Sequence, residues 1–264
     1  MTEPGKVYLI GAGPGALDLM TLRALRMLES ADAVVYDRLV SPEILEMAPT
    51  TAQMIPVGKA PKCHTVPQDR INEILAELAQ QGLTVARLKG GDPLIFGRGS
   101  EEAAHLSDLG IAVEYAPGIT AAQGMAAATG VPLTHRGLAT GVRYVTGHRA
   151  RDQKLDLDWA SLACEDTTLV VYMGVANIAE IALGLMREGM PGSLPVLAVS
   201  NVTTPREGRL ISRLDQIGLD MAARPMRAPV LFVIGHVVSL YREDHSACEL
   251  GEEIPTHAVA MAGE

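Results

Sequence analysis

A loop with four glycines, residues 90–99, constrains the fold of this chain more than any other stretch. The apolar run at residues 85–88 comes directly before it and predicts a buried strand. After it, Ser100 is a residue type that caps helices, and the acids that follow favour a first helical turn. Open α/β sheets bind ligands in such a loop, between a strand end and a helix start. A tight surface turn is the alternative, since glycine and proline clusters also mark ordinary turns.

A second glycine-rich loop, GAGPGA at residues 11–16, follows an apolar strand at residues 7–10. It resembles the dinucleotide-binding fingerprint, and Asp37, after the strand at 33–36, stands where a ribose-binding acid would. Pro14 removes one backbone N–H from the loop. Asp18 and Thr21 postpone the helix, so its N-terminus is not expected to face a pyrophosphate. A nicotinamide-dependent oxidoreductase therefore stays open as one hypothesis.

Strands alternate with helices through most of the chain, which predicts an α/β fold with two domains. Glycine and proline at residues 130–132 punctuate the end of a first series of units. We expect an N-terminal α/β domain over residues 1–131 with a mostly parallel sheet. A C-terminal α/β domain over 136–245 should carry a mixed sheet, because residues 200–209 look like a hairpin. Residues 246–264 lose periodicity and are expected to form a loose tail.

Composition narrows the classes of partner. The 264 residues hold 22 Lys and Arg against 31 Asp and Glu, a net charge of −9. Such a field disfavours nucleic acid and anionic membranes, and an aromatic content of 3% disfavours base stacking. Three widely spaced cysteines indicate a reducing compartment, and no apolar run is long enough to cross a membrane. A cytoplasmic location is the expectation.

Several short motifs then coincide in order along the chain. They are GAGPG (11–15), DLMT (18–21), VYDRLVS (35–41), VGK (57–59), KGGDPLIFGRG (89–99), PGITA (117–121), PLTHR (132–136), TGH (146–148) and YMG (172–174). Over residues 5–240 the chain resembles the tetrapyrrole methylase family, and within it the members that act on uroporphyrinogen III. The resemblance implies a homodimer that binds S-adenosyl-L-methionine in a cleft between two α/β domains. It also implies methylation at C2 and C7, giving precorrin-2 by way of precorrin-1 for sirohaem, cobalamin or haem d1.

The resemblance assigns roles residue by residue. The implied cofactor contacts are Pro14, Gly90, Gly91, Asp92, Ile95, Phe96, Thr120, Ala121, Met173 and Val202. Asp37, Lys59 and Arg98 match the family's catalytic positions, and substrate contacts match Arg98, Glu101, Arg136 and His148. Val202 departs from the glycine that the family usually has there, so only a backbone contact would survive. The substrate's eight carboxylates need a local basic cluster, for which Arg143, Arg149 and Arg151 are further candidates from composition alone.

Ordinary structural roles remain the alternatives for these residues. Asp37 could be a turn residue, Lys59 and Arg136 solvated surface charges, and Met173 a core residue. No metal is expected, because the histidines have no metal-ligand spacing and the adjacent Cys63 and His64 suit no common zinc motif. A non-catalytic interaction domain is the third class of function. It leaves the arginines and both glycine loops unexplained.

Overall fold

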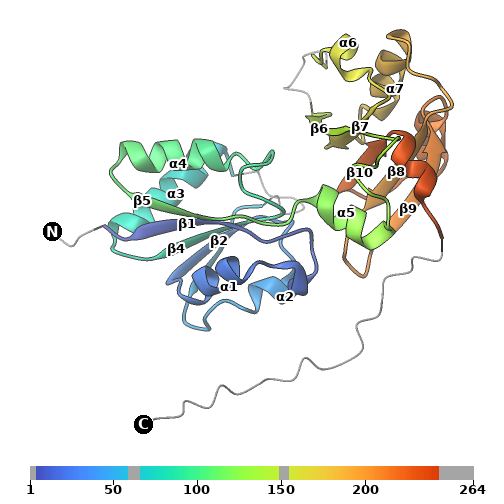
Figure 1. Ribbon diagram of the computed structural model, residues 1–264. Coiled ribbons are helices and arrows are strands. Elements are labelled where there is room, and N and C mark those ends of the chain that lie inside the picture. The colour runs from blue at the N-terminus through green and yellow to red at the C-terminus, as the bar shows by residue number, and fades with distance from the viewer. Residues whose placement is uncertain (1–3, 59–65, 149–154, 244–264) are drawn as a thin grey trace.

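The computed structural model describes residues 4–58, 66–148 and 155–243 and shows two α/β domains side by side (Figure 1). Lys59, Arg149 and Arg151 lie outside the described residues, as does the tail at 246–264. The first sheet contains β1 (Lys6–Gly11), β2 (Ala33–Tyr36), β3 (Gln53–Pro56), β4 (Val85–Lys89) and β5 (Ala112–Ala116). Its order is β3-β2-β4-β1-β5, and every pairing is parallel. All five strands therefore end at one edge.

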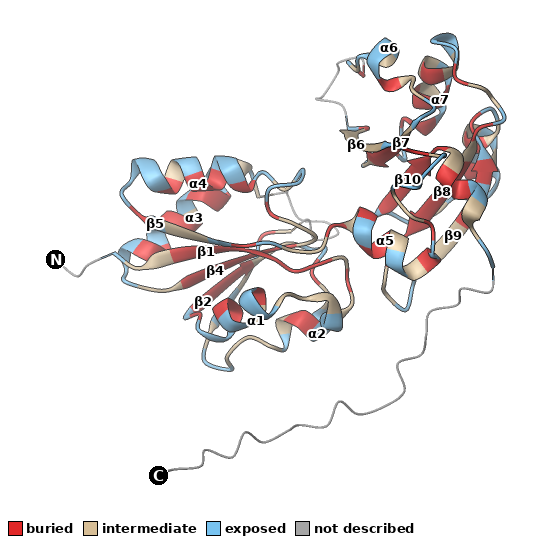
Figure 2. Ribbon diagram, in the orientation of Figure 1, coloured by how far each residue is buried: buried red, intermediate tan, exposed pale blue. Residues whose placement is uncertain are grey.

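Alternating side chains bury both faces of this sheet. In β1, Val7 and Leu9 join the core under α3 (Gln68–Gln80) and α4 (Gly99–Asp108). Tyr8 and Ile10 face the opposite core, which α1 (Leu22–Glu29) and α2 (Pro42–Leu45) cover. The period of two in a strand makes this division, and a sheet covered on both faces reads as a continuous apolar run. Figure 2 shows the inner strands β1, β2 and β4 buried and the helices exposed on their outer sides, while the edge strands β3 and β5 are largely intermediate or exposed.

The second sheet is mixed, as the sequence predicted. It contains β6 (Gly141–Thr146), β7 (Thr167–Tyr172), β8 (Pro195–Ser200), β9 (Gly208–Arg213) and β10 (Val230–Ile234) in the order β6-β7-β10-β8-β9. Only β6 and β7 pair in parallel, while β8 and β9 form the expected hairpin. The short α6 (Trp159–Leu162), α7 (Ile178–Arg187) and α8 (Ile217–Ala223) cover one face. The 3₁₀ turns η1 (Leu17–Leu19) and η2 (His236–Leu240) complete the described elements.

Helix α5 (Ala121–Thr129) belongs to the second domain, not the first. Ala122 and Met125 are fully buried and pack with Val170, Leu197 and Leu231 of the second sheet. The expected boundary at residue 131 therefore lies too late, and the chain crosses between the cores before α5. The glycine and proline at 130–132 mark the end of this helix, whose C-cap Gly130 is left-handed.

The start of α4 also differs from the expectation. Ser100 lies inside α4, whose N-cap is Arg98 in a left-handed conformation. The backbone N–H of Gly99 bonds to the carbonyl of Pro93 at 2.9 Å, and the helix begins two residues earlier than a cap at Ser100 would give. Among the described residues, no helix is long and apolar enough to cross a membrane.

Candidate active site

Three loops meet at the carboxyl edge of the first sheet, after β1, β4 and β5. Gly13 and Gly91 exchange two backbone hydrogen bonds of 3.2 and 2.7 Å, which joins the first two loops. Gly118 packs against them so closely that a Cβ there would lie 2.0 Å from the carbonyl oxygen of Gly91. Gly11 and Gly118 are thus required for contact between backbones, since a Cβ on Gly11 would lie 2.4 Å from the backbone nitrogen of Gly118. Gly13 and Gly91 are favoured by their positive φ of 77 and 68°.

Asp92 fixes the geometry of this edge. Its Oδ1 accepts a hydrogen bond from the backbone N–H of Leu94 at 2.8 Å, and its Oδ2 accepts one from Gly118 at 3.1 Å. Gly91 has a φ of +68°, and a Cβ there would meet nothing within 4 Å. The backbone at Gly91 is therefore open on the side from which a ligand could approach.

An aromatic contact joins the two domains at this edge. The rings of Phe96, in the first domain, and Tyr172, at the end of β7, have centroids 5.1 Å apart. Tyr144 lies edge-on to Tyr172 at 5.6 Å. The Tyr172 hydroxyl also accepts a hydrogen bond from the backbone N–H of Ala122 at 3.2 Å, and burial raises the pKa of this phenol. Tyr172 therefore holds the start of α5 and the glycine loop together.

A second contact joins the loop after β1 to the loop after β8. The backbone N–H of Ala16 donates to Thr203 Oγ1 at 3.1 Å. A Cβ on Gly15 would lie 3.0 Å from the carbonyl oxygen of Val202, whose side chain is buried in the second core. The structure thus presents the backbone of Val202, not its side chain, to the GAGPG loop. We call these facing loops, residues 12–16, 90–98, 117–120, 172–174 and 201–204, the interdomain junction.

Backbone strain gathers at the interdomain junction. Within the described parts of the chain, five non-glycine residues have positive φ. They are Phe96, Arg98, Met173, Asn201 and Thr203, with φ between 48 and 60°. All five lie in junction loops, and such strain persists where the surrounding structure holds it, commonly at functional sites. Met173 is half exposed rather than core, so the core alternative for it is wrong.

Arg98 and Glu101 lie together on the exposed start of α4. The Arg98 guanidinium donates through Nε and Nη2 to the two Glu101 oxygens at 2.9 and 2.7 Å. This fork holds the pKa of Glu101 below its usual value. Both side chains are about half exposed, so the pair is open to solvent.

Asp37 stands at the same edge, directly after β2, and is not a simple turn residue. Its Oδ1 pairs with Arg87 Nη2 at 2.8 Å, and its Oδ2 lies 3.9 Å from Lys89 Nζ. Both cations are buried in β4 and also bond to the buried Glu102 of α4. Sequence reasoning missed this cluster, although two cations at alternate positions of an apolar strand were its visible signal.

Thr120 and Ala121 begin α5 at the edge, and a helix start leaves backbone N–H groups without partners inside the helix. Thr120 forms a capping box, in which its N–H donates to Gln123 Oε1 at 3.1 Å. Its N–H is therefore used inside the helix start, and the N–H of Ala122 is taken by Tyr172. Of the N–H groups at this helix start, that of Ala121 is the candidate for a ligand.

The remaining substrate candidates are less closely grouped. His148 is exposed just after β6, beside the Met173 loop, because β6 and β7 run in parallel and end together. Arg136 is exposed in the turn closed by His135 and Ala139, which leads into the other end of β6. The Arg143 guanidinium is engaged by the backbone carbonyl and hydroxyl of Ser161. Within one chain, then, Arg136 is not brought to the interdomain junction.

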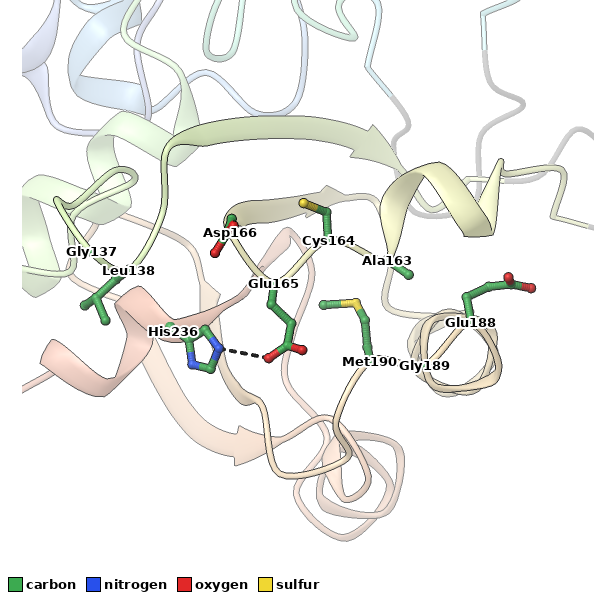
Figure 3. Close-up of a pocket in the computed structure, with 10 residues that line it drawn as sticks. All are labelled: Gly137, Leu138, Ala163, Cys164, Glu165, Asp166, Glu188, Gly189, Met190 and His236. Atoms are coloured by element: carbon green, nitrogen blue, oxygen red, sulfur yellow. Dashed lines mark hydrogen bonds and ion pairs between the residues drawn. The ribbon is translucent and has the colours of Figure 1, made fainter.

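A separate surface cavity of ≈ 510 Å³ lies around the start of β7 (Figure 3). Its charged lining is Glu165, Asp166, Glu188 and His236, with a Glu165–His236 contact of 3.1 Å. Three carboxylates against one imidazole do not suit a polycarboxylate substrate. None of its lining residues lies in the interdomain junction. In the described part of the chain, no group of three or more His, Cys, Asp or Glu could hold a metal.

The first glycine loop does not have the geometry of a dinucleotide site. The 3₁₀ turn η1 stands between the loop and α1, whose N-cap is Thr21. The N–H of Ala16 is used by Thr203, and Asp37 is engaged by Arg87 instead of facing a ribose. Two α/β domains with strained loops where they meet define the class: a two-domain α/β protein whose first glycine loop lacks the geometry of a Rossmann dinucleotide site.

Comparison with known proteins gives the particular family. Residues 6–218 match the family described as Tetrapyrrole (Corrin/Porphyrin) Methylases, and the chain belongs to it. A uroporphyrinogen-III C-methyltransferase from Paracoccus denitrificans is 58% identical over 250 residues, covering 95% of this chain and 86% of that protein. The nicotinamide and non-catalytic hypotheses are therefore wrong.

A solved structure supports the same fold. The uroporphyrin-III C-methyl transferase from Thermus thermophilus complexed with S-adenyl homocysteine has a TM-score of 0.78 and 39% identity. The match covers 90% of this chain and 100% of the Thermus thermophilus chain. A siroheme synthase from Chromobacterium violaceum is 46% identical over 94% of this chain, which spans only 54% of that relative's length.

Proposed function

We propose that this chain transfers methyl groups from S-adenosyl-L-methionine to C2 and C7 of uroporphyrinogen III, giving precorrin-2 through precorrin-1. The single observation that carries the proposal is the 58% identity to a uroporphyrinogen-III C-methyltransferase along 95% of the chain. The interdomain junction supports it, because every described residue assigned to the cofactor lies in or directly beside its loops.

The junction fits S-adenosylmethionine on chemical grounds. Gly91 leaves open backbone at a positive φ, and Ile95, Phe96 and Met173 expose apolar surface around it. Apolar and aromatic side chains with a few backbone polar groups are the usual lining of a cofactor site. The sulfonium supplies an already activated methyl group, so the chain's own task is to hold the two reactants in line.

Asp37 is our candidate for the carboxylate that stabilises positive charge on the substrate or accepts a proton from it. Methylation of a pyrrole carbon leaves positive charge on the ring nitrogen, which a fixed carboxylate stabilises or relieves by accepting a proton. Asp37 lies beside the end of β4, which leads into the glycine loop, since its backbone N–H bonds to the carbonyl of Leu88 at 3.3 Å and its Oδ2 lies 3.9 Å from Lys89 Nζ. Lys59, which lies outside the described residues, remains a proposed partner in this chemistry.

Substrate carboxylates require cations despite the net charge of −9. We assign Arg98 to this role, with Glu101 orienting its guanidinium, and place His148 nearby. Arg136 is proposed as a peripheral contact.

Several finer points complete the proposal. We propose that the protein is a homodimer and that residues 246–264 are dispensable for its assembly. We also propose that the enzyme is cytoplasmic. Its product would supply the formation of sirohaem, cobalamin or haem d1. The siroheme synthase relatives support the first pathway. The solved structure of a cobalamin biosynthetic enzyme, a cobalt precorrin-4 methyltransferase, has a TM-score of 0.78 and 25% identity and supports the cobalamin pathway.

Anaerobic conversion of uroporphyrinogen III with methyl-labelled S-adenosylmethionine tests the function. We expect two labelled methyl groups per product molecule, with a singly methylated species appearing first. A product with no label, or with label only on another tetrapyrrole, would refute the assignment. Mass spectrometry of the oxidised product separates these outcomes.

A further inference from the structure

Four charged side chains form one connected group under the edge of the first sheet. Arg87 and Lys89, two residues apart on β4, point to the face covered by α3 and α4 and are 1% and 3% exposed. Glu102 of α4 is fully buried, and its Oε1 accepts from Arg87 Nε at 3.1 Å and from Lys89 Nζ at 2.8 Å. Asp37 is the fourth member.

The charges of this group balance only when Asp37 is included. The buried cations number two, and Glu102 supplies one negative charge. The second comes from Asp37, whose side chain is 30% exposed and is the only one of the four to reach the surface. The group is thus a neutral unit whose accessible end is a carboxylate at the interdomain junction.

Stability alone does not account for such a group. Replacing buried ion pairs by apolar residues of similar volume is often neutral or stabilising. The bonding is also uneven, since Glu102 Oε2 is buried without a partner among the described residues, while Oε1 also accepts from Gln68 at 3.0 Å. Arg87 instead extends its Nη2 past Glu102 to Asp37 at 2.8 Å.

We propose that Arg87, supported by Glu102 and Lys89, is the positioning residue that fixes the Asp37 carboxylate toward the substrate. One planar guanidinium bridges both carboxylates, with Nε on Glu102 and Nη2 on Asp37. Lysine carries a single ammonium and cannot reproduce this bridge. The inference rests on the proposed role of Asp37 in methyl transfer.

Lys89 supports the same arrangement from the side. Its Nζ lies 2.8 Å from Glu102 and 3.9 Å from Asp37, so it holds the bridge without forming it. Burial lowers the pKa of this ammonium, and Arg87 lowers it further. On the remaining side, α3 contributes the uncharged Gln68 and Asn72, which bond to each other at 3.0 Å.

Kinetics in a double-mutant cycle test the proposal. Arg87→Lys should lower kcat by roughly tenfold or more, while affinity for S-adenosylhomocysteine stays within about twofold. In an Asp37→Asn background the same change should have almost no further effect, because Arg87 acts through Asp37. Gln68→Met is the matched control: it removes a bond to Glu102 but none to Asp37, and should leave kcat unchanged.

Independent, multiplying effects of the two substitutions would overturn the proposal. So would an Asp37→Asn variant with wild-type kcat in which Arg87→Lys still lowers kcat. A wild-type protein that methylates no uroporphyrinogen III would instead refute the proposed function. Crystal structures of the wild type and Arg87→Lys give a readout without activity: we expect the Asp37 carboxylate to turn away, and an unmoved carboxylate contradicts the inference. Glu102→Gln serves the same comparison if Arg87→Lys does not fold.

Discussion

The carboxylate of Asp92 accepts a hydrogen bond from the backbone N–H of Gly118 at 3.1 Å, linking loops 26 residues apart. Its other oxygen accepts from Leu94 inside its own loop. The two bonds hold the glycine loop after β4 against the loop that leads into the second domain. One side chain thereby sets the shape of the edge at which the cofactor is proposed to bind.

Asp92→Ala should lower both stability and cofactor affinity. The substitution removes the acceptor of two backbone N–H groups, the exposed one of Leu94 and the partly buried one of Gly118. Leaving the Gly118 donor unsatisfied costs about 1–3 kcal/mol in the free energy of unfolding. We expect S-adenosylhomocysteine to bind more weakly in calorimetry. Asp108→Ala, at an exposed position near the end of α4, is the control. Equal effects of the two substitutions would contradict the linking role of Asp92.

Tyr172→Phe should change how stability depends on pH. Burial raises the pKa of this phenol above its usual 10.0, so the folded protein keeps a proton that the unfolded chain loses. Below pH 10 the phenol is protonated in both the folded and the unfolded protein, so the difference in pKa does not change the free energy of unfolding. Above pH 10 the free energy of unfolding of the wild type falls as the pH rises. Phenylalanine removes that part of the loss, although it also costs about 1 kcal/mol at neutral pH through the bond to Ala122.

Urea unfolding at pH 8 and pH 10.5 measures both quantities. The wild type should lose more free energy of unfolding between these two pH values than Tyr172→Phe does. Identical pH dependence in the two proteins would show that the phenol is not the buried, neutral contact described here. The other tyrosines and the lysines are common to both proteins and cancel in the difference.

The sequence predicted the strands well because each is a short apolar run bounded by turn residues. β2 at Ala33–Tyr36 begins and ends at the predicted residues. Helix α5 was assigned to the wrong domain, since its small-residue pattern does not say which sheet it covers. The packing of Met125 on the second sheet decides that, and it is a long-range contact.

The site was predictable where it depends on local backbone. Glycine loops at strand ends are visible in the sequence, and the structure brings Gly13, Gly91 and Gly118 together. The support of Asp37 was not predictable in this way. Arg87 interrupts an apolar run, and its partner Glu102 lies in the first turn of α4. Acidic residues are common in a first helical turn, so the sequence gives no sign that Glu102 is buried against Arg87.

Arg98→Lys should bind S-adenosylhomocysteine normally yet lose most methylation. The fork of Arg98 engages both oxygens of Glu101, and lysine cannot hold Glu101 and also meet a substrate carboxylate at two points. We expect kcat/KM for uroporphyrinogen III to fall by roughly tenfold or more. Arg136→Lys should be milder and chiefly raise KM.

Arg213→Lys is the matched control for these arginines. Arg213 is exposed on β9 and pairs with Asp215 at 3.0 Å, a similar surface pair that lies outside the interdomain junction. Its kinetics should equal those of the wild type. Near-wild-type kcat and KM for Arg98→Lys would remove Arg98 from the proposed site and leave Asp37 and Lys59 to act with other substrate anchors.

Removal of residues 246–264 should leave assembly unchanged. We expect sedimentation to give a dimer at micromolar concentration for both the full chain and the shortened one. A full-length monomer under these conditions would contradict the proposed homodimer, and a monomer only after truncation would assign the tail a role in the interface.

Calorimetry with S-adenosylhomocysteine and NAD on one preparation tests the central claim, that the interdomain junction is a methyltransferase cofactor site. The geometry of Gly91, Phe96 and Met173 predicts one molecule of S-adenosylhomocysteine bound per chain, weakened by Asp92→Ala, and no binding of NAD. Binding of NAD without binding of S-adenosylhomocysteine would contradict it.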